Sequence, residues 1–166
     1  MRLVIAAAVL SFIASAALAA APAKPAQFDP ADPAGLMAVL ASNDAKAQRI
    51  QGAGGVVVLN VETPAGKFGV QFVGCDDNGK SCDMAAFSTA FQNRGPTLAQ
   101  INTFNRSQVA CRGYLTEDGR SSVMYGLLLT PRLSQADLKQ HLGVWQSCLA
   151  IFGRFNRDPQ SFLNSN

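Results

Sequence analysis

Four cysteines are the residues of this chain whose type and spacing suggest chemistry most directly. Cys75 and Cys82 bracket six residues, 76–81, between two stretches that alternate like β-strands. Strand parity places both side chains opposite one another across a hairpin, on the sheet face turned away from the core. Facing strand residues approach the Cβ separation of about 4 Å that a disulfide needs. We therefore predict a Cys75–Cys82 bridge.

The second pair, Cys111 and Cys148, leaves two alternatives open. Cys111 lies on the apolar face of a predicted strand and Cys148 on the apolar side of a predicted helix, so both should enter the same interface. They either form a disulfide or remain buried free thiols that act as small hydrophobic side chains. A zinc site and a thioredoxin-like redox role are disfavoured. The chain has no Cys-x-x-Cys motif, and its single histidine, His141, is far in sequence from any cysteine pair.

Other polar residues give weaker signals for chemistry. The oxygen-rich loop of residues 76–78 and Asp83 resembles part of a calcium loop, but Gly74 stands where a further Asp is needed and no Glu closes the loop. We predict a plain hairpin turn there. His141 has no Ser or Cys nucleophile nearby and is interpreted as a boundary residue. Since no catalytic or phosphate-binding motif occurs, we expect a protein that is not an enzyme and holds no cofactor or metal.

Four residues are candidates for a binding surface. Asn102, Asn105 and Arg106 belong to a segment with more polar side chains than packing requires. The alternative is structural, because Asn102 lies beside the apolar stripe of its helix and could satisfy backbone groups of a neighbouring strand. Trp145 is the fourth candidate, at an expected pocket between the last helix and the sheet.

Residues 1–19 have the features of a cleaved signal peptide. Arg2 supplies a basic start, an apolar stretch follows, and the small-x-small pattern of residues 17–19 suits signal peptidase. The alternative is a membrane anchor, which needs roughly 20 consecutive apolar residues. This stretch is shorter and contains two serines, and no cysteine follows it for lipid attachment.

Cleavage after Ala19 or Ala21 would release the protein into the periplasm or the medium, with no stable membrane insertion. Both are oxidising compartments in which disulfides persist. A tether rich in Ala and Pro, residues 20–32, would then precede one domain over 33–155 and a C-terminal tail over 156–166.

The composition excludes one class of partner. Of 166 residues, 14 are Lys or Arg and 11 are Asp or Glu, so the formal net charge is +3, or about +2 without Arg2. These charges are scattered along the chain. Because nucleic-acid binders normally show a basic stripe, we expect no nucleic-acid partner.

Hydrophobic periodicity and turn signals predict the elements that position these residues. Helices are expected over 33–46, after Thr97 and after Ser134; strands are expected over 56–61, 67–75, 82–92, 109–116 and 120–130. The last strand is apolar on both faces, as is typical of a central or doubly covered strand. The order α-β-β-β-α-β-β-α indicates an α+β fold, an antiparallel sheet flanked by helices.

The pattern of these residues resembles the YbjN-domain family. It includes residues 72–75 and Cys82, the segment from Pro96 to Arg106, residues 112–115 and the Trp145 helix. The resemblance covers about 33–155. It implies a fold like that of type III secretion chaperones, often paired into dimers, in small periplasmic bacterial proteins also labelled sensory transduction regulators. Cys111 and Cys148 are additions to the family pattern.

Two functions follow as expectations. The first is a non-enzymatic binding or adaptor domain that engages a protein or peptide partner, with a homodimer as a further arrangement. The alternative is a small-molecule sensor or carrier with its pocket between the last helix and the sheet. An exposed apolar surface would favour the first, and a closed pocket with convergent polar groups would favour the second.

Overall fold

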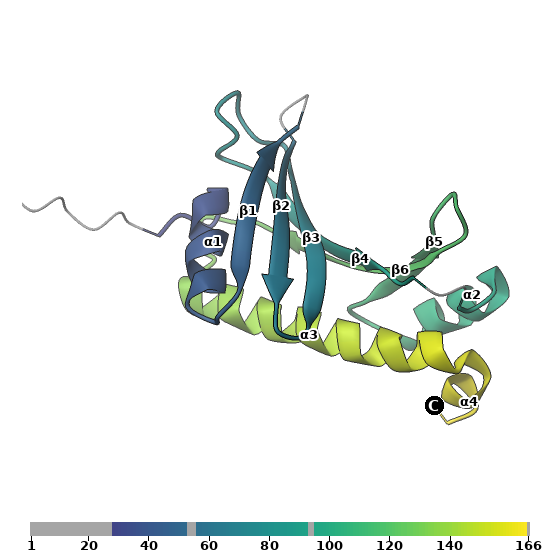
Figure 1. The fold of residues 1–166 in the computed structure, drawn as a ribbon. Coiled ribbons are helices and arrows are strands. Elements are labelled where there is room, and N and C mark those ends of the chain that lie inside the picture. The colour runs from purple at the N-terminus through teal and green to yellow at the C-terminus, as the bar shows by residue number, and fades with distance from the viewer. Residues whose placement is uncertain (1–27, 53–55, 93–94, 166) are drawn as a thin grey trace, which may run out of the picture.

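The computed structural model describes residues 28–52, 56–92 and 95–165. Within them the elements are α1 (Pro33–Ala41), β1 (Lys46–Gln51), β2 (Val57–Thr63), β3 (Gly66–Val73), β4 (Met84–Ala90), α2 (Leu98–Ser107), β5 (Arg112–Leu115), β6 (Ser121–Leu128), α3 (Gln135–Arg157) and α4 (Pro159–Asn164) (Figure 1). The predicted signal peptide, 1–19, and most of the predicted tether lie outside the described residues.

The six strands form one antiparallel sheet in the order β1-β2-β3-β4-β6-β5. Its register places apolar residues together on one face, with Val57 opposite Phe72 and Phe87 opposite Tyr125. We call this the inner face, because the buried side chains of α1, α2 and α3 join its residues in one core cluster. The predicted α+β class is confirmed.

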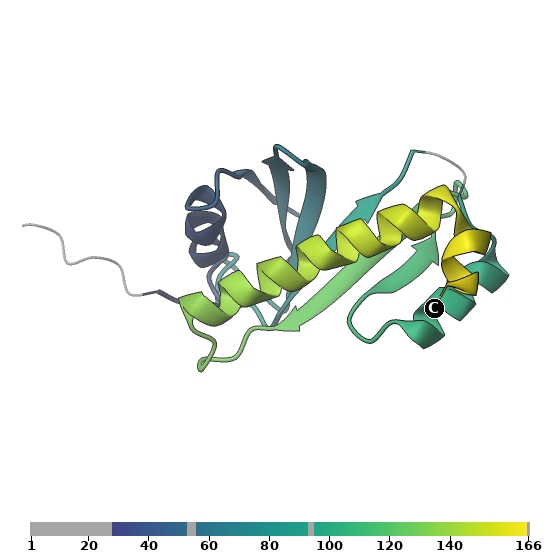
Figure 2. The same cartoon turned by 90° about the horizontal axis from the view of Figure 1, so that it is seen from below.

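Helix α3 crosses the inner face diagonally (Figure 2). A capping box begins it: the Ser134 hydroxyl accepts the Asp137 N–H at 3.1 Å, and the Asp137 carboxylate accepts the Ser134 N–H at 2.9 Å. Its buried stripe then recurs at steps of three and four, which is why one side of the helix covers the sheet. The stripe consists of Leu138, Leu142, Trp145, Cys148, Phe152 and Phe155.

Aromatic rings close one end of this core. Phe104 of α2 stacks on Phe155 with ring centroids 4.7 Å apart and meets Phe152 edge-on at 5.2 Å. Phe162 of α4 lies 5.5 Å from Phe155. The segment predicted as a tail, 156–166, therefore carries a short helix that packs against the core. Its signals were the Asp158 cap, which accepts the Ser161 N–H at 3.0 Å, and the proline that follows.

Two further element predictions were wrong. The helix expected over 33–46 ends at Ala41, because the Ser42 and Asn43 side chains donate to the Val39 carbonyl. Residues 46–51 form β1, a strand that the sequence did not predict. The order is thus α-β-β-β-β-α-β-β-α-α.

At the other end of the molecule, β5 begins only at Arg112, although a strand was expected from residue 109. Val109 is 94% exposed and so lies outside the inner face to which it had been assigned.

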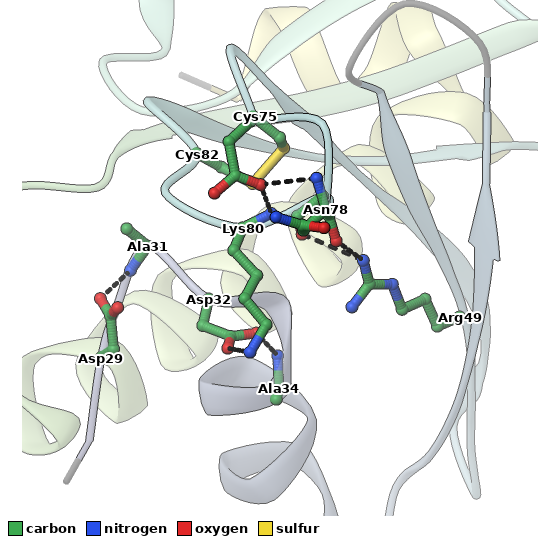
Figure 3. Close-up of a disulfide and its surroundings, with 11 residues drawn as sticks. Asp29, Ala31, Asp32, Ala34, Arg49, Cys75, Asn78, Lys80 and Cys82 are labelled. Carbon is green, nitrogen blue, oxygen red and sulfur yellow. Dashed lines mark hydrogen bonds and ion pairs between the residues drawn. A yellow bond between two sulfur atoms is a disulfide. The ribbon is translucent and has the colours of Figure 1, made fainter.

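Cys75 and Cys82 form a disulfide at the loop end of the β3–β4 hairpin (Figure 3). The expectation that both side chains point away from the core is wrong: Cys82 is 2% exposed and belongs to the core cluster. The reason is that Gly74 and Ser81 adopt positive φ angles of 70° and 52°, which rotate the cysteines out of strand parity. The bridge instead lies beside the segment before α1, where the Cys82 N–H donates to the Ala31 carbonyl at 2.9 Å.

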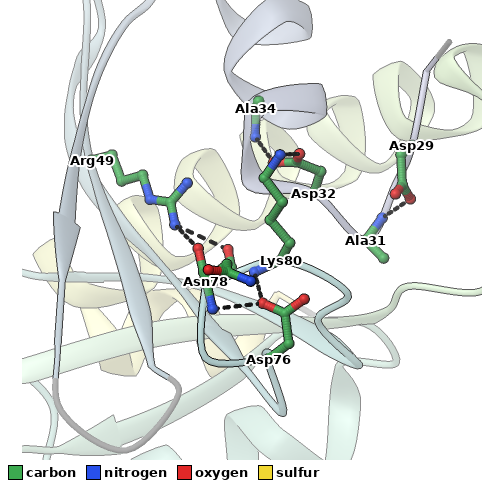
Figure 4. A network of polar contacts seen from close by, with 9 residues as sticks. Asp29, Ala31, Asp32, Ala34, Arg49, Asp76, Asn78 and Lys80 are labelled. Atoms are coloured by element: carbon green, nitrogen blue, oxygen red, sulfur yellow. Dashed lines mark hydrogen bonds and ion pairs between the residues drawn. The ribbon is translucent and has the colours of Figure 1, made fainter. Parts of the chain in front are cut away.

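Polar contacts tie the loop of residues 76–81 to α1 and β1 (Figure 4). The Asp76 carboxylate accepts two backbone N–H groups within the loop, both at 2.9 Å, so it serves a turn. Arg49 of β1 donates to two loop carbonyls at 3.0 and 3.1 Å, and Lys80 pairs with Asp32 at 3.1 Å. Burial acts to raise the pKa of Asp32, but the N–H it accepts at the start of α1 and the Lys80 ammonium bring that pKa below its ordinary value.

The structure also joins Cys111 to Cys148, with Cα atoms 5.6 Å apart. Of the two alternatives for this pair, the structure shows the bridge. The two residues are 3% and 0% exposed, so the bond lies within the core and connects the start of β5 to α3. In the described part of the chain, no helix combines the length and apolarity needed to cross a membrane.

Candidate functional site

The outer face of the sheet is left uncovered by the core helices. Alternate residues of each strand point to it, and several large apolar side chains among them remain exposed. Met84 is 38% exposed, Met124 37% and Leu128 63%. Phe87, on the same strand as Met84, points inward and is fully buried. Phe72, on the neighbouring strand β3, is also fully buried. The two faces are therefore built from one alternating pattern.

Six neighbouring residues form an apolar area on this face, which we call the outer sheet patch. The register aligns Val73 with Met84 and Met84 with Leu128; it also aligns Ala86 with Gly126 and Ser88 with Met124. Between the larger side chains lies a low strip, since a Cβ placed on Gly126 would meet no atom within 4 Å. The patch comprises Val73, Met84, Ala86, Met124, Gly126 and Leu128.

No charged side chain interrupts this part of the face. The outward residues of β3 from Gly69 on, and all outward residues of β4 and β6, are apolar or neutral. Charges lie at its borders. Glu62 and Lys67 form an ion pair on one side, and Arg112 of β5 lies opposite Met124 on the other. A surface without charge needs no charged group to be desolvated when a partner covers it.

One end of the outer face is polar and hollowed. A depression of about 490 Å³ is lined there by side chains that include Asn60, Ser88, Tyr114 and Ser122. The Ser122 hydroxyl is buried and has no hydrogen-bond partner in the described residues. The outer face thus offers an apolar patch with a polar hollow beside it.

The candidate residues on α2 have different roles. Asn105 is bound to edge strand β5: its amide oxygen accepts the Gly113 N–H at 2.7 Å, and its amide nitrogen donates to the Gly113 carbonyl at 3.0 Å. The side chain thereby takes the place of a neighbouring strand, the role that the sequence suggested for Asn102. Asn102 itself is exposed, and Arg106 donates to Thr103 at 3.0 Å on its own helix.

Trp145 lies apart from these three residues. Its indole packs edge-on against Phe68, with centroids 5.6 Å apart, and near Phe87 at 5.9 Å. Phe104 of α2 packs instead on the Phe152 and Phe155 rings. The structure therefore does not gather the four candidates into one surface.

A cleft of about 660 Å³ does lie next to Trp145, and we call it the Trp145 cleft. Its walls are the end of α1, the turn between β2 and β3, and one side of α3. The lining residues are Leu40, Asn43, Ala45, Thr63, Pro64, Ala65, Phe68, Lys139, Leu142, Gly143, Trp145, Gln146, Leu149 and Ala150.

The single histidine contacts a tyrosine on the inner face. His141 Nδ1 hydrogen-bonds the Tyr125 hydroxyl, and the two rings stack with centroids 6.0 Å apart. Burial raises the pKa of Tyr125 above its ordinary value. Among the described residues, no three His, Cys, Asp or Glu side chains lie close enough together to hold a metal ion.

Comparison with known proteins adds one finding. Residues 32–154 match the family YbjN, described as "Putative bacterial sensory transduction regulator". The chain belongs to the YbjN family. No curated protein and no solved structure matches it. The family description is that of a regulator, which supports a regulatory or adaptor role for this YbjN protein over an enzymatic one.

The outer sheet patch was not among the sites predicted from the sequence. Its signal was the strand over 120–130, apolar on both faces, which was interpreted as central or doubly covered. In the structure, β6 does lie between β4 and β5, but Met124 and Leu128 on its outer side are exposed. A doubly apolar strand in a sheet with helices packed on one face is therefore the pattern that indicates such a patch.

Proposed function

We propose that this YbjN protein is a non-enzymatic adaptor that binds a protein or peptide partner on the outer sheet patch. The observation that carries the proposal is a charge-free area with Met84, Met124 and Leu128 partly exposed on a sheet face that the core does not use. Covering such an area releases about 25 cal/mol for each Å² of apolar surface. Exposed apolar areas on soluble domains commonly mark interaction sites.

Two features of the patch suit a polypeptide. Methionine side chains are flexible and polarisable, so they adapt to apolar side chains of different shape. The low strip at Ala86 and Gly126 leaves room for the backbone or a bulky side chain of a partner. An open surface of this kind suits a protein partner, whereas small ligands generally bind in concave sites.

We place this interaction in the periplasm or the medium, after cleavage of residues 1–19. Two disulfides fit an oxidising compartment. The N-terminal basic and apolar regions of the sequence supply the export signal in this proposal.

The test is crosslinking in the native host, followed by purification of the C-terminally tagged full chain. Leu128→Lys should lower partner recovery at least about tenfold, because a lysine ammonium in a covered apolar area is not solvated. Leu98→Lys is a matched control: Leu98 is 61% exposed and Leu128 63%, but Leu98 lies on α2. Intact mass of the purified chain reports whether it begins after Ala19 or Ala21.

Two results would contradict the proposal. Equal recovery with Leu128→Lys and Leu98→Lys would show that the outer sheet patch is not the contact surface. Crosslinks only between two copies of the chain would make the patch a dimer interface, with no separate partner.

A further inference from the structure

The Trp145 cleft has an apolar interior made from three separate segments of the chain. Leu40 comes from α1, Pro64 and Phe68 from the β2–β3 hairpin, and Leu142 and Leu149 from α3. Its volume, about 660 Å³, lies within the range of roughly 300–1,000 Å³ in which proteins bind small molecules. Unlike the outer sheet patch, it is concave and lies on the inner side of the sheet.

Lys139 is the charged residue among those that line the cleft, and no acidic side chain lines it. Lys139 is exposed and forms no ion pair within the described residues. The acidic residue nearest to it along α3, Asp137, is engaged by Ser134 in the capping box. Among the residues that line the cleft, the charge is therefore positive, and no ion pair holds it.

A second, independent feature is a hydrogen-bond donor without an acceptor. Trp145 lines the cleft, is 0% exposed, and its Nε1–H has no partner in the described residues. Buried tryptophan N–H groups usually find an acceptor, because leaving one unpaired is costly. Among the lining residues, Asn43 donates its amide to the Val39 carbonyl and Thr63 its hydroxyl to the Gly66 carbonyl.

We propose that the Trp145 cleft binds a small anionic amphiphile, an acyl chain that ends in a carboxylate. The chain packs against the leucines, Phe68 and Pro64, and the carboxylate pairs with the Lys139 ammonium. This assignment is independent of the outer sheet patch, so the two sites can be tested separately.

Trp145 is the one tryptophan of the whole sequence, so all tryptophan emission comes from a residue that lines this cleft. We would titrate the full-length mature protein with dodecanoate below its micelle concentration, and with dodecan-1-ol and dodecylammonium in parallel. Dodecanoate should change the emission saturably at one molecule per chain. The neutral and cationic probes should bind about tenfold more weakly or not at all, because a charge-assisted contact is lost.

Two pairs of variants locate the binding. Lys139→Gln should weaken dodecanoate about tenfold, while Lys46→Gln on β1 should leave binding unchanged. Ala150 is exposed on α3 and lines the cleft, so the ring of Ala150→Phe should fill the cleft and abolish saturable binding. Ser147→Phe is its control, since Ser147 is exposed on the same helix but does not line the cleft. Circular dichroism of each variant establishes that it is folded.

Several results would overturn the proposal. One is the absence of a saturable response to dodecanoate in the folded wild-type protein. Another is equal binding of dodecan-1-ol and dodecanoate, which would remove the anionic part of the assignment. A third is unchanged binding in Ala150→Phe, which would place the amphiphile elsewhere on the molecule.

Discussion

The two faces of this sheet are made by the same strands, yet one is buried in the core and the other is exposed. On the inner face, Phe72, Phe87 and Val70 are fully buried under α3 and its neighbours. On the outer face, Met84 and Leu128 are exposed and no charge separates them. The alternation of strand side chains permits this division, because successive residues never share a face. Stability depends on one set of positions, and the binding that we propose uses the other.

The largest expected effect comes from removing an α3 ring that packs in the core on the inner face. Phe152→Ala should lower the free energy of unfolding by about 4 to 5 kcal/mol, because a buried ring leaves a cavity. Phe152 contacts three other rings, at centroid distances of 5.2 Å (Phe104), 5.4 Å (Phe91) and 5.5 Å (Phe155). Urea unfolding followed by Trp145 fluorescence measures the loss.

The matching change on the outer face is Met124→Ala. Met124 is 37% exposed, so its truncation should cost less than about 1 kcal/mol. Similar losses for the two variants would show that the outer face also carries part of the stability.

Removing the Cys111–Cys148 disulfide should cause the next largest loss in the free energy of unfolding. The Cys111–Cys148 bridge spans 37 residues and the Cys75–Cys82 bridge spans 7. On the loop-entropy model, the double Ala variants should lose about 4 and about 2 kcal/mol, respectively. Guanidinium unfolding of the two double variants beside the oxidised wild type gives both values. The reverse ranking would mean that burial of Cys82 against the segment before α1 matters more than loop length.

A smaller effect than that of either disulfide is expected at the edge where the two faces meet. Asn105→Ala should cost about 1.5 kcal/mol, since it removes two hydrogen bonds from partly buried backbone groups of Gly113. Amide hydrogen exchange at Gly113 should also become faster. Asn102→Ala, on the exposed side of the same helix, is the control and should change stability by less than about 0.5 kcal/mol. Equal losses of stability in the two variants would show that the Asn105 side chain does not stabilise the edge of β5.

The elements predicted well were those whose signals lie within a few residues. The last helix was predicted from Ser134, Asp137 and the apolar stripe that follows, and the structure has its capping box at that place. A turn likewise separates β5 from β6, between the strands expected over 109–116 and 120–130, with Gly119 at φ 79°. Strand β1 was missed because its sequence, KAQRIQ, has little apolar alternation. It forms because β2 pairs along its whole length, with Lys46 opposite Glu62 and Gln51 opposite Val57.

The candidate site depended more on tertiary structure. Asn102, Asn105 and Arg106 were predicted together from their polarity, and the structure gives Asn105 a strand-edge contact that Asn102 lacks. Trp145 was placed at a pocket between helix and sheet, and a cleft does lie there. Two of its three walls, however, come from residues about 75 to 105 positions earlier in the chain, which no local pattern relates to Trp145.

The sequence by itself determined the α+β class, the alternation that separates the two faces, and the Cys75–Cys82 pairing, whereas export through residues 1–19 stays a prediction. These depend on periodicity, caps and turns, which act over a few residues. Only the tertiary structure decided that Cys111 joins Cys148, that Cys82 turns into the core, and that the outer side of β6 stays exposed. Those outcomes depend on the order of strands in the sheet and on the face that α3 covers, both of which are set by contacts between distant residues.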